Sequence, residues 1–243
     1  MAAMKKSAKN FFRSVMSDVH FAKQNASDIG SQADVRFPRG KRIRHRAKLC
    51  ADAEANYTTK ANPKLTPVEK EYYSLVKTVF ALLAPFYDVV TYPFQGVRDA
   101  VVRFANAKIG SRILDVCTGT GKQAFAFAKK GYGVIGVDLS EDMLNVAKRK
   151  NKYRNVKFQI ADATSLPFKS NSFDVSCVSF ALHDMPLTIR ERALKEMTRV
   201  TKPKGMIVIV DYGLPKNAIG RFLVYHFVKL YEKYYPEFIE SDL

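Results

Sequence analysis

The sequence predicts an α/β protein of the Rossmann-like class, with a mostly parallel β-sheet and helices on both of its faces. From residue 112 onward, short runs rich in β-branched residues alternate with stretches of helical periodicity, as in parallel strands joined by crossover helices. The first such run ends in a turn that contains Gly119 and Gly121. In this class of sheet, ligands bind beyond the carboxyl ends of the strands, where this turn would lie.

Each element of this fold has its own sequence signal. Apolar residues at helical spacing predict two helices before the sheet, at 68–83 and 94–105, with Pro85 between them. Five strands are expected at 112–117, 133–139, 156–162, 172–181 and 206–212, with helices at 122–130, 142–150 and 187–201. This alternation of strands and helices favours a parallel sheet.

Composition divides the chain into two parts. Of its 243 residues 47% are hydrophobic, enough for one substantial core, and the net charge is +17. Much of the charge lies in residues 1–65, which include the basic run from Arg36 to Lys48, and we expect them to form a partly disordered arm. The arm could contact phosphate or anionic lipid, although a solvated tail explains the same charge. Residues 66–243 are expected to form the folded domain.

Missing signals exclude several classes of protein. No apolar run reaches the length of a membrane span, and the N-terminal residues lack the apolar stretch of a secretory signal, so we expect a cytoplasmic protein. The three cysteines, Cys50, Cys117 and Cys177, are odd in number and show no metal-ligand spacing. We therefore expect reduced thiols, no disulfide framework and no metal site.

The glycine turn is compatible with two kinds of nucleotide ligand. Gly119, Gly121 and Ala124 satisfy the dinucleotide pattern G-x-G-x-x-A, and Asp138 after the next strand could hold the ribose of a nicotinamide cofactor. Asp115, however, closely precedes the turn, where a carboxylate would repel a pyrophosphate and favour cationic groups. S-adenosylmethionine (SAM) carries an ammonium and a sulfonium beside its adenosine, so it fits this turn better.

Four spaced motifs between Tyr72 and Gly213 agree with this interpretation: ILDVCTGTGKQ, GVDLSEDML, IADATSLPF and FDVSCVSFALHDMP. Together they resemble the class I SAM-dependent methyltransferases, in particular the ubiquinone/menaquinone C-methyltransferases and their phosphatidylethanolamine-methylating relatives. The resemblance implies that Asp138 holds both ribose hydroxyls and that Asp162 receives the adenine amino group. The other cofactor contacts that it implies are Asp115, Gly119, Thr120, Gly121, Leu139, Met143, Ala163 and Phe180.

Some of these residues also have purely structural explanations. Asp115 and Asp138 could cap helix N-termini, each stabilising the fold by about 1 kcal/mol. Met143 lies on a helical stripe, where core packing would explain it. We favour the cofactor role for the two acids because their spacing agrees with that of Gly119 and Asp162.

Two residues are candidates for a direct role in the chemistry. Tyr87 follows the break at Pro85, and the resemblance suggests that its ring faces the sulfonium, which an aromatic face attracts; a core tyrosine is the alternative. His183 follows the fourth strand, where an imidazole could accept a proton from the methyl acceptor while Asp184 orients it. A histidine that only hydrogen-bonds the loop is the alternative.

The C-terminus departs from the family pattern. A complete domain of this family ends with a helix and an antiparallel strand pair, whereas residues 214–243 suggest one aromatic, basic helix from Asn217 to Tyr235 and a short tail. We expect the strand pair to be absent, which would leave the fifth strand, 206–212, as an open apolar edge. Such an edge predicts self-association, and the helix could touch a membrane that holds a lipid acceptor.

The predicted function is methyl transfer from SAM to a small-molecule or lipid acceptor, at a quinol carbon or an amine, by direct SN2 displacement. A nucleic-acid methyltransferase is an alternative favoured by the basic arm, but no NPPY-type tetrapeptide follows the fourth strand, so nucleic acid is not the expected partner. The same motifs are also compatible with a truncated, non-catalytic SAM-binding protein and, less well, with a nicotinamide oxidoreductase.

Overall fold

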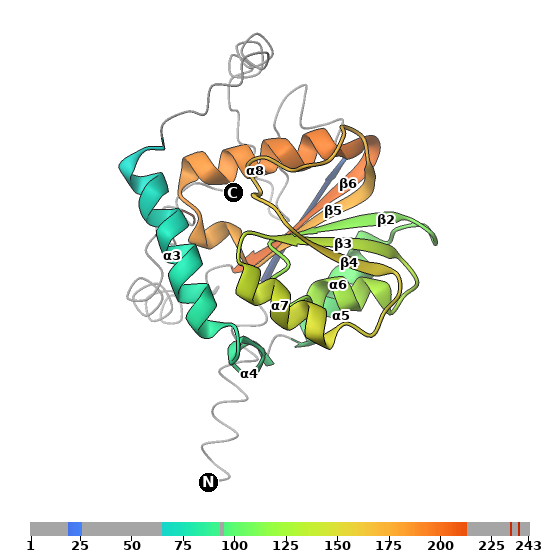
Figure 1. The fold of residues 1–243 in the computed structure, drawn as a ribbon. Helices are drawn as coiled ribbons and strands as arrows, with labels where there is room; N and C mark the ends of the chain where they lie inside the picture. The colour runs from blue at the N-terminus through green and yellow to red at the C-terminus, as the bar shows by residue number, and fades with distance from the viewer. Residues whose placement is uncertain (1–18, 26–64, 93–94, 213–233, 235–237, 239–243) are drawn as a thin grey trace, which may run out of the picture.

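The computed structural model describes residues 19–25, 65–92, 95–212, 234 and 238, which form a six-stranded sheet with helices on both faces (Figure 1). The helices are α3 (Pro67–Leu83), α4 (Tyr87–Val90), α5 (Gln95–Ala105), α6 (Lys122–Ala128), α7 (Glu141–Lys150) and α8 (Leu187–Val200), with a short 3₁₀ helix, η3 (Leu182–Asp184). The strands are β1 (Val19–Asn25), β2 (Arg112–Val116), β3 (Gly133–Asp138), β4 (Val156–Ile160), β5 (Phe173–Ser179) and β6 (Thr201–Tyr212). The predicted helices and strands between residues 67 and 212 are confirmed.

The order of the strands creates a binding position near the middle of the sheet. The order is β1-β6-β5-β2-β3-β4, and β2 to β6 run parallel to one another. The chain moves outward from β2 through β3 to β4 and then returns to place β5 on the other side of β2. Such a reversal opens a crevice at the carboxyl ends of the strands, which is where ligands bind in open α/β sheets.

The outer edge of β6 is covered, so the predicted open edge is wrong. β1 pairs antiparallel with β6 in a register that runs from Val19 opposite Tyr212 to Asn25 opposite Met206. A segment of the expected N-terminal arm therefore completes the sheet. Its backbone hydrogen-bonds the N–H and C=O groups of β6 that could otherwise pair with a strand of another molecule. This edge thus gives no reason to expect self-association. The predicted helix from Asn217 to Tyr235 lies outside the described residues, except for Tyr234, which is buried.

Two apolar clusters cover the two faces of the sheet. Neighbouring residues of a strand point to opposite faces, and β2 shows this directly, because Leu114 packs in the cluster formed with α3 and α8 while Ile113 packs in the cluster formed with α5 and α6. The same alternation places Asp115 on the α5 and α6 side.

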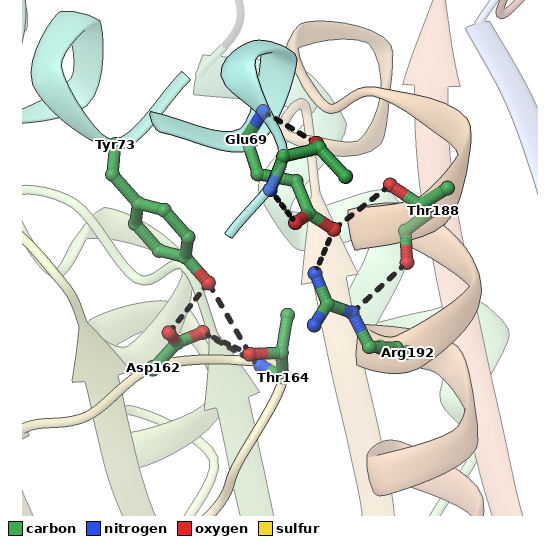
Figure 2. A network of polar contacts seen from close by, with 7 residues as sticks. Glu69, Tyr73, Asp162, Thr164, Thr188 and Arg192 are labelled. Atoms are coloured by element: carbon green, nitrogen blue, oxygen red, sulfur yellow. Dashed lines mark hydrogen bonds and ion pairs between the residues drawn. The ribbon is translucent and has the colours of Figure 1, made fainter. Parts of the chain in front are cut away.

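Helix α3 is fixed at its start and along one side. Thr66 and Glu69 form a capping box, in which each side chain accepts a hydrogen bond from the other residue's backbone N–H. Glu69 also forms an ion pair with Arg192 of α8 and accepts a hydrogen bond from Thr188 (Figure 2). The backbone bond from Thr66 is the largest effect that holds the pKa of Glu69 below its ordinary value, with the Arg192 charge contributing. These contacts join α3 to α8 beside the carboxyl ends of the strands.

Two further kinds of feature are missing from the part of the chain that the structure describes. None of its helices is long and apolar enough to cross a membrane. It also contains no group of three or more His, Cys, Asp or Glu side chains arranged to hold a metal ion.

Candidate cofactor site

A cleft lies at the carboxyl ends of β2, β3, β4 and β5, beneath α3 and α4. The space between its walls and across its open mouth is about 1070 Å³. Nine of the twelve predicted site residues line it: Tyr87, Gly119, Thr120, Asp138, Leu139, Met143, Asp162, Ala163 and Phe180. Asp115, Gly121 and His183 do not.

Asp138 connects the end of β3 to the glycine turn. Its Oδ2 accepts a hydrogen bond from the backbone N–H of Gly119 at 2.8 Å, and its Oδ1 accepts one from Ser140 at 2.9 Å. Burial is the main cause that raises the pKa of Asp138, and these backbone hydrogen bonds oppose it. The carboxylate is therefore fixed in orientation at the wall of the cleft, with lone pairs left to accept hydroxyl donors.

The two glycines of the turn have different tasks. Both have positive φ, 54° at Gly119 and 81° at Gly121, which a residue with a Cβ adopts at a cost. At Gly121 an added Cβ would lie 2.7 Å from the Phe158 ring, so this glycine is required by packing beneath the turn. At Gly119 the nearest atom would be 3.9 Å away, on Tyr87. Gly119 therefore presents bare backbone to the cleft, whereas Gly121 does not line it.

Asp115 is a structural acid beneath the turn rather than a wall of the cleft. It is 1% exposed and accepts a hydrogen bond from Thr118 Oγ1 at 2.5 Å. Burial raises the pKa of Asp115 to about 7, although the Thr118 bond and the Arg98 charge oppose the rise. Asp115 does not line the cleft, and the electrostatic selection of a cationic ligand by its carboxylate stays a prediction. An acid that stabilises the turn is the explanation that fits.

Asp162 belongs to a network that reaches α3. Its Oδ1 accepts hydrogen bonds from the backbone N–H and the hydroxyl of Thr164, both at 2.8 Å, and its Oδ2 accepts one from the Tyr73 hydroxyl at 2.7 Å (Figure 2). A carboxylate offers about four acceptor positions. Three are in use, so one position on Oδ2 is left for a ligand donor. Burial is the main cause that raises the pKa of Tyr73 to about 12, which keeps it a donor at neutral pH.

Helix α4 is fastened over the glycine turn by Asp88. The Thr120 hydroxyl donates to Asp88 Oδ1 at 2.6 Å, Lys150 of α7 forms an ion pair with Oδ2, and Lys122 donates to the Asp88 carbonyl oxygen at 2.8 Å. These contacts place Tyr87 in the cleft wall next to Gly119. Thr120 therefore lines the cleft, while its hydroxyl group is hydrogen-bonded to Asp88 of α4.

The structure buries His183 and places Asp184 in the wall of the cleft. The His183 side chain is 4% exposed and its Nδ1 lies 2.6 Å from Asp211 Oδ1, on β6. It does not line the cleft, whereas Asp184, expected only to orient it, does. Adjacent side chains in η3 point in different directions, so His183 is buried while the next residue, Asp184, is partly exposed. His183 is thus not placed to touch an acceptor.

Several lining residues were missed by sequence reasoning, among them Tyr73, Arg98 and Asp184 as a cleft residue. Arg98 lies on α5 and Tyr73 on α3, both outside the strand-end motifs that identify this class of site. The helical stripe that contains Tyr73 also contains Val76 and Phe80, which line the cleft as well. Their i, i+3 and i+7 spacing was the one available signal, and it is equally typical of core packing.

Comparisons with known proteins agree with this geometry. A family described as "Methyltransferase domain" matches residues 113–205. The chain is 39% identical over 168 residues to the demethylmenaquinone methyltransferase of Staphylococcus haemolyticus, covering 65% of this chain and 68% of that protein. It is 39% identical over 153 residues to the demethylmenaquinone methyltransferase of Paenarthrobacter aurescens, covering 61% and 59%. The chain thus spans roughly three fifths to two thirds of the length of these two relatives.

Among solved structures, the crystal structure of the [4+2]-cyclase SpnF is similar, with a TM-score of 0.52 and 25% identity over 56% of this chain and 59% of that one. Its name describes a reaction other than methyl transfer. The shared fold therefore supports the architecture described above and leaves the reaction to be argued from the site.

Proposed function

This chain belongs to the class I SAM-dependent methyltransferases, near the group of the demethylmenaquinone methyltransferases, and we propose that it transfers a methyl group from SAM to a small-molecule or lipid acceptor. The observation that carries the proposal is Asp138, which is hydrogen-bonded to the Gly119 backbone and faces the cleft. An acid in this position, beside a turn with no Cβ, suits a nucleoside whose ribose lies across the turn.

The residues of the cleft fit SAM along its whole length. Asp138 would accept both ribose hydroxyls, and the remaining acceptor position of Asp162 would take the adenine amino group. Leu139, Met143 and Ala163 line the cleft beside these acids and would border the adenine ring. When bound, SAM supplies a methyl group on a sulfonium, which an acceptor displaces directly.

The charges that line the cleft divide into two groups. Asp138, Asp162 and Asp184 follow β3, β4 and β5, whereas Arg98 on α5 and Lys122 on α6 are the cations that line the cleft among the described residues. The carboxylate of the amino-acid end of SAM needs a charged donor when it is taken out of water. We therefore place it toward Arg98, whose fork of donors matches a carboxylate.

Helices α3 and α4 would exclude water from the transferred group. Phe80 of α3 and Tyr87 of α4 have ring centroids 6.4 Å apart in an edge-to-face arrangement, and both line the cleft. The Tyr87 ring lies beside the glycine turn, where it would face the sulfonium and attract it by about 1–2 kcal/mol in a dry site. This role for Tyr87 is binding and orientation rather than proton transfer.

Exposed apolar side chains on and beside α4 favour an apolar or lipid acceptor. Leu82, Phe86, Val89 and Tyr92 are 77%, 66%, 75% and 70% exposed. Large exposed apolar side chains that lie close together commonly mark a surface that meets an apolar partner. Peripheral contact with a membrane that contains the acceptor would use them, and co-sedimentation of the protein with liposomes would measure it.

Transfer of tritium from methyl-labelled SAM tests the proposed function. Quinols, phospholipid amines and small amines are supplied separately as acceptors, with Asp138→Ala as the matched variant. We expect label in one acceptor class, and a loss of about tenfold or more in SAM affinity in the variant, because two charge-assisted hydrogen bonds are removed. Undiminished SAM binding by Asp138→Ala would contradict the ribose assignment, and intact binding without transfer to any class would favour a non-catalytic protein.

A further inference from the structure

Asp184 is the acid that lines the cleft on the β5 side of the glycine turn, whereas Asp138 and Asp162 lie on the β3 and β4 side. It ends η3, directly after β5, and its side chain is 28% exposed. The cleft is also lined by Tyr72 and Val76 of α3, by Met185 directly after η3 and by Ile189 of α8. Burial raises the pKa of Tyr72, and the Asp184 charge is close enough to add to this rise. An ionisable group set among apolar walls is a recurrent feature of sites that move protons.

A buried pair holds Asp184 from behind. His183 Nδ1 lies 2.6 Å from Asp211 Oδ1, and Asp211 Oδ2 accepts hydrogen bonds from the backbone N–H groups of Leu182 at 3.0 Å and His183 at 3.3 Å. One carboxylate of β6 therefore fixes both the backbone of η3 and the imidazole ring. The opposite nitrogen, Nε2, lies 3.6 Å from Asp184 Oδ2, an ion-pair distance rather than a hydrogen bond.

Arg190 of α8 rigidifies the same turn from the other side. It is fully buried, and its guanidinium donates to the carbonyl oxygens of Leu182 at 3.2 Å and Met185 at 3.0 Å. The Phe238 ring lies 5.0 Å from this guanidinium and 6.3 Å from the His183 ring. Such packing leaves the backbone that carries Asp184 little freedom, which is what a group used for chemistry requires.

The surroundings of Asp184 select the chemistry of its partner. A carboxylate repels an anionic acceptor such as a phosphate ester, whereas it can accept a proton from a neutral hydroxyl group. The aromatic and aliphatic walls formed by Tyr72, Val76 and Ile189 match a flat ring. An aromatic hydroxyl compound satisfies both conditions.

We propose that Asp184 is the general base for an aromatic hydroxyl acceptor seated between α3 and the start of α8, and that His183 and Asp211 position its carboxylate. The inference rests on the proposed function and names the acceptor class. In the step, the acceptor O–H bond breaks, its electron pair stays on the oxygen, and the proton forms a bond to an Asp184 carboxylate oxygen. The oxygen's electron density then enriches the ring carbons, and the proton leaves through the exposed part of the Asp184 side chain.

The charges around Asp184 predict how its variants shift with pH. Burial is the main cause that raises the pKa of Asp184; the His183 charge lowers it and the Asp211 charge raises it. Other ionisable groups of this region are Arg190, which packs on η3, and Tyr72 and Cys117, whose own pKa values are raised mainly by burial and in part by the Asp184 charge. His183→Asn should therefore move the Asp184 titration to higher pH, and Asp211→Asn should move it to lower pH.

A chromogenic phenol tests the acceptor site without any turnover. 4-Nitrophenol absorbs differently as phenol and as phenolate, so its visible spectrum reports the state in which it is bound. Beside the Asp184 carboxylate the bound probe should stay neutral to higher pH than it does in Asp184→Asn. Asp174→Asn, a change of a half-exposed acid at the other end of β5, is the matched control and should behave as the wild type. Identical titrations in wild type and Asp184→Asn would overturn the proposal.

Turnover with a hydroquinone acceptor gives the second measurement. Asp184→Asn should lower the transfer rate by about 100-fold or more, as loss of a general base does, and leave the affinity for S-adenosylhomocysteine unchanged. His183→Asn should shift the rising limb of the rate profile to higher pH. If His183→Asn instead lowers the rate equally at every pH and leaves the rising limb at the same pH, the His183–Asp211 pair is only structural and the positioning role is overturned. A probe that behaves as expected, in a wild type that transfers no methyl group, would refute the proposed function and leave the acceptor site standing.

Discussion

The buried carboxyl group of Asp115 makes a strong prediction about stability. Its pKa rises from 3.8 to about 7 because burial disfavours the charged form. An acid with a raised pKa binds its proton more tightly in the folded state than in the unfolded state. The free energy of unfolding therefore decreases as the pH rises from about 4 to about 7. Complete ionisation of Asp115 lowers it by about 4 kcal/mol, and about 3 kcal/mol of this loss occurs between pH 5 and pH 8.

Asp115→Asn removes this ionisation and keeps the shape of the side chain. The amide oxygen can still accept the hydrogen bond from Thr118, so the variant should fold as the wild type does. Between pH 5 and pH 8 the free energy of unfolding of the variant should rise by about 3 kcal/mol relative to that of the wild type. Urea denaturation followed by circular dichroism, at pH 5, 6, 7 and 8, measures the difference directly.

Two results would refute this reasoning. A constant difference between variant and wild type across the pH range would mean that Asp115 does not titrate there. A loss of S-adenosylhomocysteine affinity larger than about threefold in the variant would mean that the carboxylate touches the ligand after all, as the sequence had suggested, although the structure places it outside the cleft.

Three further predictions concern other parts of the molecule. Tyr73→Phe removes the hydrogen bond to Asp162 and should lower the free energy of unfolding by about 1–2 kcal/mol, measured by urea denaturation, with no change if the bond is not made in solution. Arg98→Met should weaken S-adenosylhomocysteine binding by about tenfold or more, and it should leave the binding of methylthioadenosine, which lacks the carboxylate, unchanged. An equal loss of affinity for both ligands in calorimetric titrations would contradict the assignment of Arg98 to the carboxylate. Deletion of residues 1–25 removes β1 and leaves the outer edge of β6 unpaired, so the protein should self-associate, as measured by light scattering. A monomer at all concentrations would show that β1 does not protect this edge.

Local sequence signals were sufficient for the strands β2 to β6 and for the helices α3, α5, α6, α7 and α8. Each strand and helix there has a periodicity of its own, and the order of the elements fixes a parallel sheet with a crevice at the carboxyl ends. β1 could not be predicted in this way, because its pairing with β6 joins residues nearly 190 positions apart. The segment VHFAKQN also lies in a basic stretch with weak alternation, so nothing local distinguishes it from the rest of the arm.

Side-chain direction explains the errors within the site. Asp138, Asp162 and Gly119 line the cleft, because residues at or just after the end of a strand lie at the crevice; their contacts with a cofactor stay predictions. Asp115 lies within β2, one residue before its end, and strand alternation assigns it to the face of Ile113. The alternation of side chains along β2 would therefore have predicted that Asp115 is buried. The 3₁₀ conformation of η3, by contrast, is not encoded in any pattern, so His183 and Asp184 could not be distinguished.

The central claim is that the cleft binds SAM through the acid at the end of β3, and isothermal titration of the purified chain with S-adenosylhomocysteine and with NAD tests it most directly. We predict saturable binding of one S-adenosylhomocysteine per chain, a marked loss in Asp138→Asn, and no heat from NAD. Saturable binding of NAD, with no binding of S-adenosylhomocysteine, would contradict it.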